Sequence, residues 1–478
     1  MQQFLDKLLE VVNLVNSYAA DYILVFLLVG TGLFFTVRTK FVQVRCFGEG
    51  IKKVFGNLSL KGGKQQGGLS SFQALATAIA AQVGTGNIVG ACGAILVGGP
   101  GAIFWMWVIA FFGMATIYSE AVLAQKTRET DAEGNVAGGP VYYIKKAFTG
   151  GFGKFLAAFF AVSVVLALGF MGSMVQSNSI GESVNTAIGI DPWIVGIIVS
   201  VFAAAIFIGG INRIAAVTEK MVPIMALLYI VGGLAIIVCR IKYIPETFGM
   251  IFKFAFAPQA IIGGGIGAAL KTAISQGAKR GLFSNEAGMG STPHAHALAK
   301  VEKPHDQGVV AMIGVFIDTF IVLTMTALVV ISCLYAGDGP LAKVGVDASA
   351  LGLANTNMVQ ESIKTALAGF MGSGVAAKVG AIFVAICLLF FAFSTIISWN
   401  LFGKINFEYL FGKKSVVIYS IIAVVFIFLG SCLKSDLVWA LTDFFNYLMV
   451  IPNVIALIAL NKLVKDEAEN GKRLKAKE

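Results

Sequence analysis

Residues 82–90 read QVGTGNIVG, and residues 280–290 read RGLFSNEAGMG. Each stretch interrupts an apolar segment that is otherwise long enough to cross a lipid bilayer. A backbone that leaves helical geometry inside a bilayer cannot replace its lost hydrogen bonds from lipid, so such breaks survive only within protein or beside a watery cavity. Two breaks at corresponding places in two halves of a chain are the best sequence indication of a transporter's binding site.

The composition is that of a polytopic membrane protein. Of the 478 residues, 57% are hydrophobic and 13% are charged, whereas soluble proteins carry about 25% charged residues. The net charge of +10 is explained by lysines and arginines in cytoplasmic loops, so we expect a lipid bilayer and no nucleic acid as partner. The six cysteines are scattered singly and without a CxxC pair, which predicts neither a metal cluster nor a disulfide framework.

Eleven segments are long enough to span the membrane. Most of the 36 lysines and arginines fall in loops on one side, which places the N-terminus outside and the tail 463–478 in the cytoplasm. Residues 1–17 form an amphipathic pattern, either an interfacial helix or the lead-in to the first span. The expected spans are 19–37, 70–96, 100–125, 155–180, 192–212, 217–240, 260–294, 308–336, 376–402, 415–433 and 437–461.

The order of these segments predicts the fold. With the first span set aside, ten remain, and each group of five opens with one of the interrupted segments, entered from opposite sides of the membrane. We therefore expect an all-α protein of eleven transmembrane helices, one extra N-terminal helix followed by a 5+5 inverted repeat. The corresponding units are 1–69, the repeats 70–245 and 246–462, and the tail 463–478.

The first break offers groups for two kinds of ligand. Glycines permit unusual backbone angles and a close ligand approach. Unwinding exposes N–H groups that favour a carboxylate and carbonyls that suit a small hard cation, and Thr85 and Asn87 add side-chain oxygens. Packing of small residues against a neighbouring helix is the alternative, and Gly86 and Gly90 fit its GxxxG spacing.

Polar groups in other spans leave further alternatives open. Gln176 and Asn178 either bind a zwitterion or join two helices. Ser394 and Thr395 carry adjacent hydroxyls, which suit sodium or bond to the preceding helical turn. In the second break, Phe283 offers an apolar wall and Ser284 a hydroxyl, while Arg280 and Glu286 are either functional or pair with each other. The carboxylates Glu120, Asp318 and Asp443 serve as proton sites, cation sites or structural partners.

Several classes of function are not supported. No nucleotide-binding domain and no nucleophile–base constellation is visible, so an enzyme or a primary pump is not expected. Few charges occupy the predicted cavity, and a strongly charged solute would lack a partner there. This favours a small zwitterion or a neutral solute as substrate.

Six motifs run in order along nearly the whole chain and resemble those of the alanine or glycine:cation symporter family. They are GTGNIVG at 84–90, GGPVYYI at 138–144, RGLFSNEAGMGS at 280–291, IDTFIVLT at 317–324, FSTIISW at 393–399 and IPN at 451–453. The resemblance implies a sodium-coupled importer of alanine, glycine or similar amino acids in the plasma (inner) membrane of a prokaryote. It also implies a leucine-transporter-like core of the APC superfamily.

The resemblance further implies two sets of site residues. The substrate pocket would consist of Thr85, Gly86, Asn87, Gln176, Phe283, Ser284 and Trp399. The bulk of Phe283 and Trp399 would leave room for little more than a methyl side chain. By similarity of residues 83–87 to the leucine transporter, the Na+ site would use the carbonyls of Ala80, Val83 and Phe391 and the hydroxyls of Ser394 and Thr395.

Secondary active transport by alternating access, with Na+ as the coupling ion, is the mechanism we expect. A proton-coupled symporter of the same fold, using Asp318, Glu120 or Glu286, is one alternative, and a solute channel is another. The sequence gives no indication of the oligomeric state.

Overall fold

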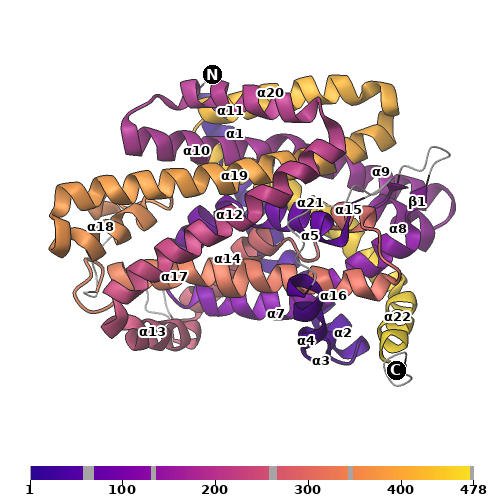
Figure 1. The fold of residues 1–478 in the computed structure, drawn as a ribbon, viewed down its shortest axis with the longest axis horizontal. Helices are drawn as coiled ribbons and strands as arrows, with labels where there is room; N and C mark the ends of the chain where they lie inside the picture. Colours follow the sequence, from indigo (N-terminus) through magenta and orange to yellow (C-terminus); the bar gives the residue numbers. More distant parts are fainter. Residues whose placement is uncertain (1, 57–68, 131–135, 258–265, 343–347, 474–478) are drawn as a thin grey trace.

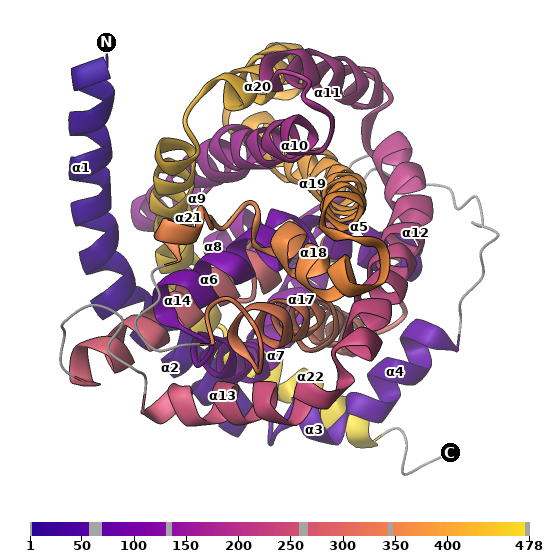
Figure 2. The same ribbon diagram turned by 90° about the vertical axis from the view of Figure 1, so that its left-hand side faces the viewer.

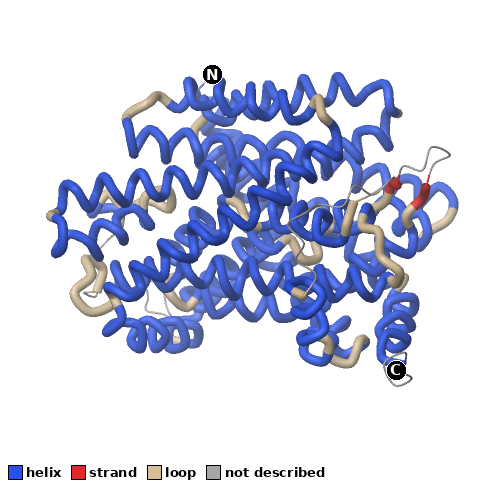
Figure 3. The backbone as a smooth tube through the Cα atoms, viewed as in Figure 1, coloured by secondary structure: helices blue, strands red, loops and turns tan. Residues whose placement is uncertain are grey.

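The computed structural model describes residues 2–56, 69–130, 136–257, 266–342 and 348–473. Within these residues the chain is almost entirely helical, with one two-stranded antiparallel ribbon (Figures 1 and 3). The start of the predicted span 260–294, and part of the predicted loop between the first and second spans, lie outside the described residues. The helical, polytopic class predicted from composition is confirmed.

Seven helical stretches of the described residues are long and apolar enough to cross a membrane, and a bent pair is an eighth candidate. The seven are α7 (Ala102–Thr127), α9–η3–α10 (Gly150–Val164, Val165–Gly172, Ser173–Ile188), α12 (Gly210–Cys239), α16–η5–α17–η6 (Pro304–Val315, Phe316–Leu323, Thr324–Val330, Ile331–Tyr335), α19 (Ser373–Phe411), η8–α20 (Lys413–Ser415, Val416–Cys432) and α21 (Ser435–Ala459).

The remaining elements include the bent pair, the interrupted second segment and the peripheral helices. They are α1 (Gln2–Tyr18), η1 (Ala19–Leu24), α2 (Val25–Arg38), α3 (Val42–Arg45), α4 (Phe47–Phe55), α5 (Ser71–Gln82), η2 (Gly86–Gly90), α6 (Ala91–Gly98), β1 (Glu129–Thr130), β2 (Val136–Ala137), α8 (Pro140–Ala147), α11 (Pro192–Phe207), η4 (Ile241–Tyr243), α13 (Ile244–Phe256), α14 (Ile266–Asn285), α15 (Pro293–Leu298), η7 (Ser349–Leu351), α18 (Met358–Met371) and α22 (Asn461–Arg473).

The first predicted break is present. A capping box of Ser70 and Gln73 starts α5, which ends at Gln82. Val83 then leaves helical geometry, with φ −80° and ψ 85°, and helical structure resumes at Gly86. The two halves of this segment are bent by 46°.

The second break is present but begins later than its glycines predict. Residues 280–285 are helical, because α14 continues to Asn285. The chain then turns through left-handed angles at Glu286, Gly288 and Gly290, where φ is 57°, 89° and 82°. Proline supplies the fixed φ and needs no N–H bond at a first helical position, and Pro293 starts α15.

The two ends of the bundle carry different peripheral elements. In Figure 1, α13 and α18 lie at the left end of the long helices, whereas β1, α8 and α22 lie at the right end. This separation agrees with the predicted alternation of loops. α2 and α11 are shorter apolar helices, so the count of eleven spans stays a prediction, as do the inverted repeat and the side that faces the cytoplasm.

The N-terminal segment is helical, as its amphipathic pattern predicts. In Figure 2 many of the long helices are seen nearly end-on, while α1 runs along the edge of the bundle and across their direction. Asn16 Nδ2 donates a hydrogen bond of 2.8 Å to the carbonyl of Ala440 in α21. This arrangement fits an interfacial helix held against the bundle.

Candidate cation and amino-acid site

The two interrupted segments contact each other in the middle of the bundle. Gln82 Nε2 donates a hydrogen bond of 2.7 Å to the carbonyl of Asn285. A Cβ atom built on Gly86 would lie 3.0 Å from Phe283 Cδ1 and 3.1 Å from Ser284 Cα, so glycine permits a closer approach here than a larger residue would. Gly86 thus takes part in the packing of a small residue against a neighbouring helix, which is the alternative interpretation of the first break. A Cβ on Gly90 would meet no atom nearer than 3.8 Å, so Gly90 is not held in the same way.

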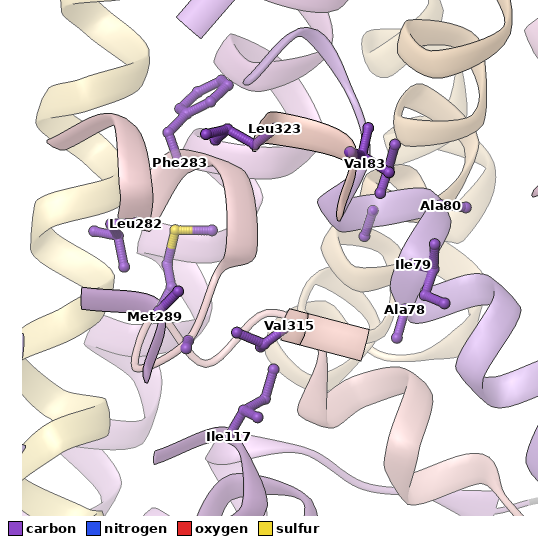
Figure 4. Packing of buried hydrophobic residues seen from close by; sticks show 14 of the residues in the cluster. Ala78, Ile79, Ala80, Val83, Ile117, Leu282, Phe283, Met289, Val315 and Leu323 are labelled. Atoms are coloured by element: carbon purple, nitrogen blue, oxygen red, sulfur yellow. The ribbon is translucent and has the colours of Figure 1, made fainter. Parts of the chain in front are cut away.

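Apolar side chains surround this contact. One buried hydrophobic cluster contains Ala80 in α5, Val83 just after the end of α5, and Leu282 and Phe283 in α14 (Figure 4). A low-dielectric surrounding strengthens each polar interaction within it and raises the cost of any polar group left unpaired.

The carboxylate of Asp318 joins the two segments. Asn87 Nδ2 donates to Asp318 Oδ1 at 2.7 Å, and Ser284 Oγ donates to Asp318 Oδ2 at 2.9 Å. Thr319 Oγ1 adds a third hydrogen bond, of 2.8 Å, to Oδ2. Asp318 is fully buried, and none of the ion pairs found among the described residues includes it. A buried carboxylate held by neutral donors carries a charge that a bound cation can complement.

Glu120 holds the second break in shape. The backbone N–H groups of Gly288 and Gly290 donate to the two oxygens of Glu120 at 3.2 and 3.0 Å. Asn453 Nδ2 donates to Oε1 of the same carboxylate at 2.6 Å and to the carbonyl of Gly288 at 2.9 Å. Successive N–H groups in such a turn form an anion-binding concavity, so Glu120 has the geometry of a structural partner.

Arg280 and Glu286 do not pair with each other, contrary to one of the two interpretations from the sequence. Arg280 forms a two-pronged ion pair with Asp443, at 3.2 and 3.0 Å. Glu286 accepts hydrogen bonds from Trp399 Nε1 at 2.5 Å and from Ser291 Oγ. The reason is that α14 is still helical at Arg280, whereas Glu286 lies beyond its end.

The predicted pocket residues are brought together. The backbone N–H of Thr85 donates to Gln176 Oε1 at 3.1 Å. Phe283 packs edge-on against Trp399, with ring centroids 5.8 Å apart and an interplanar angle of 84°. Gly86 packs against Phe283 and Ser284, and Asp318 accepts hydrogen bonds from Asn87 and Ser284. Through these contacts all seven predicted pocket residues form one buried group.

Two polar atoms of this group point to a ligand. The hydroxyl of Thr85 and the amide nitrogen of Gln176 are buried and have no hydrogen-bond partner among the described residues. Buried polar groups are nearly always satisfied, so such atoms need an explanation. The amide nitrogen of Asn178 donates to the carbonyls of Gly430 and Leu433 and so joins two helices, whereas its oxygen Oδ1 has no partner among the described residues.

The predicted cation ligands also lie close together. Thr395 Oγ1 is 2.8 Å from the carbonyl of Ala80 and 3.0 Å from that of Phe391. Ser394 Oγ is 2.8 Å from the Phe391 carbonyl and 3.5 Å from that of Ala80. The hydroxyls therefore bond to the preceding turn of α19, as the alternative predicts, and also reach α5.

Val83, the fifth predicted cation ligand, lies at the end of α5 beside this group. A Cβ on the next residue, Gly84, would lie 2.4 Å from Thr395 Oγ1. The backbone of the break thus passes directly against the hydroxyl of Thr395 in α19. Oxygens of this kind are the ligands that hard cations prefer.

Comparison with known proteins identifies the family. The sodium:alanine symporter family profile matches residues 5–478. The chain belongs to this family. It is 41% identical over 461 residues to the sodium/alanine symporter AgcS of Methanococcus maripaludis, with 96% of each chain covered. It is also 37% identical to the probable sodium/glutamine symporter GlnT of Bacillus subtilis, covering 97% of this chain and 90% of the relative.

A further relative, YrbD of Bacillus subtilis, is named a putative sodium/proton-dependent alanine carrier protein. It is 39% identical over 92% of this chain and 87% of its own. Among solved structures, a manganese transporter of Eremococcus coleocola has a similar fold, with a TM-score of 0.54 at 12% identity over 86% of this chain and 89% of that chain. Family membership confirms a multi-pass transporter of the cation-coupled amino-acid class, not an enzyme.

The structure gives Asp318 and Glu120 specific roles that the sequence does not predict. From their sequence positions, Asp318 and Glu120 have three possible roles each, and neither is among the predicted substrate or cation ligands. Their position in apolar spans was the only signal, because the partners of Asp318 are 231 and 34 positions away. Only the three-dimensional arrangement shows that one carboxylate joins the breaks and the other holds the second break.

Asp318→Ala is expected to destabilise the protein, because it leaves the hydroxyl of Ser284 without its acceptor and removes one of the two acceptors of the Asn87 amide, which also donates to the backbone carbonyl of residue 318. Each buried group left unpaired costs about 1–3 kcal/mol. Asp318→Asn keeps one oxygen for Asn87 and is expected to cost less. The measurement is the thermal unfolding midpoint in detergent, with Asp191→Ala at an exposed position as control. An Asp318→Ala midpoint equal to wild type would contradict this role.

Proposed function

We propose that this protein is a sodium-coupled secondary active symporter that imports small neutral amino acids, alanine and glycine, by alternating access. The observation that carries the proposal is the pair of unpartnered buried atoms, Thr85 Oγ1 and Gln176 Nε2, at the first break. A carboxylate accepts hydrogen bonds from both groups, and the Asp318 carboxylate nearby supplies negative charge for the ammonium group of a zwitterion.

The aromatic side chains set the size of the substrate in this proposal. Phe283 and Trp399 are buried and meet edge to face. A Cβ on Gly172 would lie 2.4 Å from the Trp399 ring, so the indole is packed closely from behind and has little room to retreat. Interior packing of this density rejects added methylene groups, which favours side chains of the size of hydrogen or methyl.

Sodium is the proposed coupling ion. The Ala80, Val83 and Phe391 carbonyls and the Ser394 and Thr395 hydroxyls would bind it between α5 and α19. The relative named a sodium/alanine symporter supports this choice. Each sodium ion that moves down a potential of 100 mV contributes about 2.3 kcal/mol to uphill import.

The fold proposed for this mechanism is the leucine-transporter-like 5+5 inverted repeat, with repeats 70–245 and 246–462. Its support is the bend of 46° in the first segment and the turn at 286–292 in the second. The proposed location is a prokaryotic plasma membrane, with the N-terminus outside and the C-terminal tail in the cytoplasm.

Proton coupling is the second candidate. Asp318 favours it, as a buried carboxylate that joins the two breaks, and so does the relative named a sodium/proton-dependent carrier. Proton-driven uptake would persist without sodium and disappear when an uncoupler is added.

Uptake of radiolabelled alanine and glycine into proteoliposomes tests the function. We expect concentrative uptake under an inward sodium gradient, and its loss when potassium replaces sodium. Ser394→Ala combined with Thr395→Ala should weaken the apparent sodium affinity at least tenfold, an effect of about 1.4 kcal/mol or more. Ser373→Ala, an exposed hydroxyl on the same helix, is the control.

The outcomes separate the proposals. Unchanged sodium affinity in the double variant would place the cation elsewhere, while uptake itself could still be sodium-driven. Uptake that never exceeds equilibration under the gradient would indicate a channel and contradict the proposed symport.

Trp399→Ala is expected to widen the substrate range, because it removes the largest wall of the pocket. The measurement is competition of unlabelled valine, leucine and phenylalanine with labelled alanine for uptake. We expect inhibition by the larger amino acids in the variant only. Trp193→Ala, at a half-exposed position in α11, is the control, and an unchanged competition profile in Trp399→Ala would remove Trp399 from the pocket.

A further inference from the structure

Outside the transport site, three side chains with metal-binding atoms converge where α4 meets α16. They are Cys46, between α3 and α4, Glu49 in the first turn of α4, and His305 in the first turn of α16. One ligand atom of each lies within 4.8 Å of the others. No local sequence pattern indicates this cluster, because more than 250 positions separate Cys46 and Glu49 from His305.

The histidine of the cluster is oriented by a neighbour. The hydroxyl of Tyr118 on α7 lies 2.7 Å from His305 Nδ1, which leaves Nε2 to face the cluster. Nε2 is buried and has no hydrogen-bond partner among the described residues. Metal-binding histidines usually have their second ring nitrogen fixed by such a partner.

The spacing fits two ligands of one ion. His305 Nε2 and Glu49 Oε2 are 3.6 Å apart, beyond hydrogen-bond distance. In a tetrahedral site with metal bonds of about 2.0–2.2 Å, nitrogen and oxygen ligands lie about 3.3–3.5 Å apart. The distance of 3.6 Å between His305 Nε2 and Glu49 Oε2 would therefore have to shorten by only a few tenths of an ångström for both atoms to bind the same ion.

The surrounding structure holds these elements in register. Gly50 lets α4 approach α16 closely, since a Cβ there would lie 2.6 Å from Ile313 Cγ1. Lys53 Nζ pairs with Asp306 at 3.0 Å, next to His305. Cys46 and His305 are buried, and Glu49 is partly buried, so an ion bound here would be largely shielded from water.

We propose that Cys46, Glu49 and His305 bind a divalent transition-metal ion of the zinc class, with water in the fourth position. A sulfur, a carboxylate oxygen and an imidazole nitrogen suit zinc and exclude a calcium or magnesium site, which takes oxygen ligands. Binding releases the thiol proton to solvent. Thiolate and carboxylate together neutralise the charge of the ion, and the site fastens the segment between the first span and α5 to α16.

Cobalt binding to the full-length protein in detergent, freed of metal by chelation, tests the proposal. We expect one Co²⁺ per chain, a cobalt–thiolate charge-transfer band, and displacement of Co²⁺ by Zn²⁺. Zn²⁺ should also raise the thermal unfolding midpoint. Cys46→Ser should abolish the band, whereas Cys432→Ser, at an exposed cysteine, should keep it.

Two further variants keep the test decisive if Cys46→Ser fails to fold. Glu49→Gln should weaken Co²⁺ binding at least tenfold without loss of the thiolate band at saturation. Tyr118→Phe should weaken it by about 10–100-fold, the range found for partners of metal-bound histidines. A folded wild-type protein without a cobalt–thiolate band, or a band that survives Cys46→Ser, would overturn the proposal, and neither result would bear on sodium-driven uptake.

Discussion

A backbone that unwinds inside a membrane must find hydrogen-bond partners within the protein, and this constraint shapes the centre of the molecule. Side chains at and beside the two interrupted segments satisfy part of it. Asp318 accepts from Asn87 at the first break and from Ser284 beside the second, and Gln82 donates to the carbonyl of Asn285. Glu120 satisfies N–H groups of the second break from a third helix.

The same arrangement places two kinds of ligand group side by side. The hydroxyl of Thr395, which bonds to the carbonyl of Ala80, and the amide of Gln176 both lie beside Gly84. A cation and an amino acid bound at these groups would share the backbone of residues 83–87. Ordering that backbone for one ligand prepares it for the other, which is the physical basis of the coupling that we propose.

Much of the fold followed from the sequence, because apolar length and glycine-rich interruptions are local signals. The start of the first break was predicted to within a residue, whereas helical structure resumes at Gly86, within the predicted stretch 82–90. The second was predicted too early, since the RGLFSN stretch contains glycine and polar residues yet stays helical to Asn285. Its turn depends on left-handed angles at Glu286, Gly288 and Gly290, which glycine spacing alone does not fix. The roles of Asp318 and Glu120 and the convergence of Cys46 with His305 depend on contacts between distant segments, which no local pattern contains.

The most direct test of a shared site is the alanine affinity of the purified protein in sodium chloride and in choline chloride, measured by isothermal titration calorimetry. If one broken helix serves both ligands, sodium must raise the alanine affinity, and alanine must raise the sodium affinity by the same factor. An alanine dissociation constant that is identical in the two salts would contradict the account.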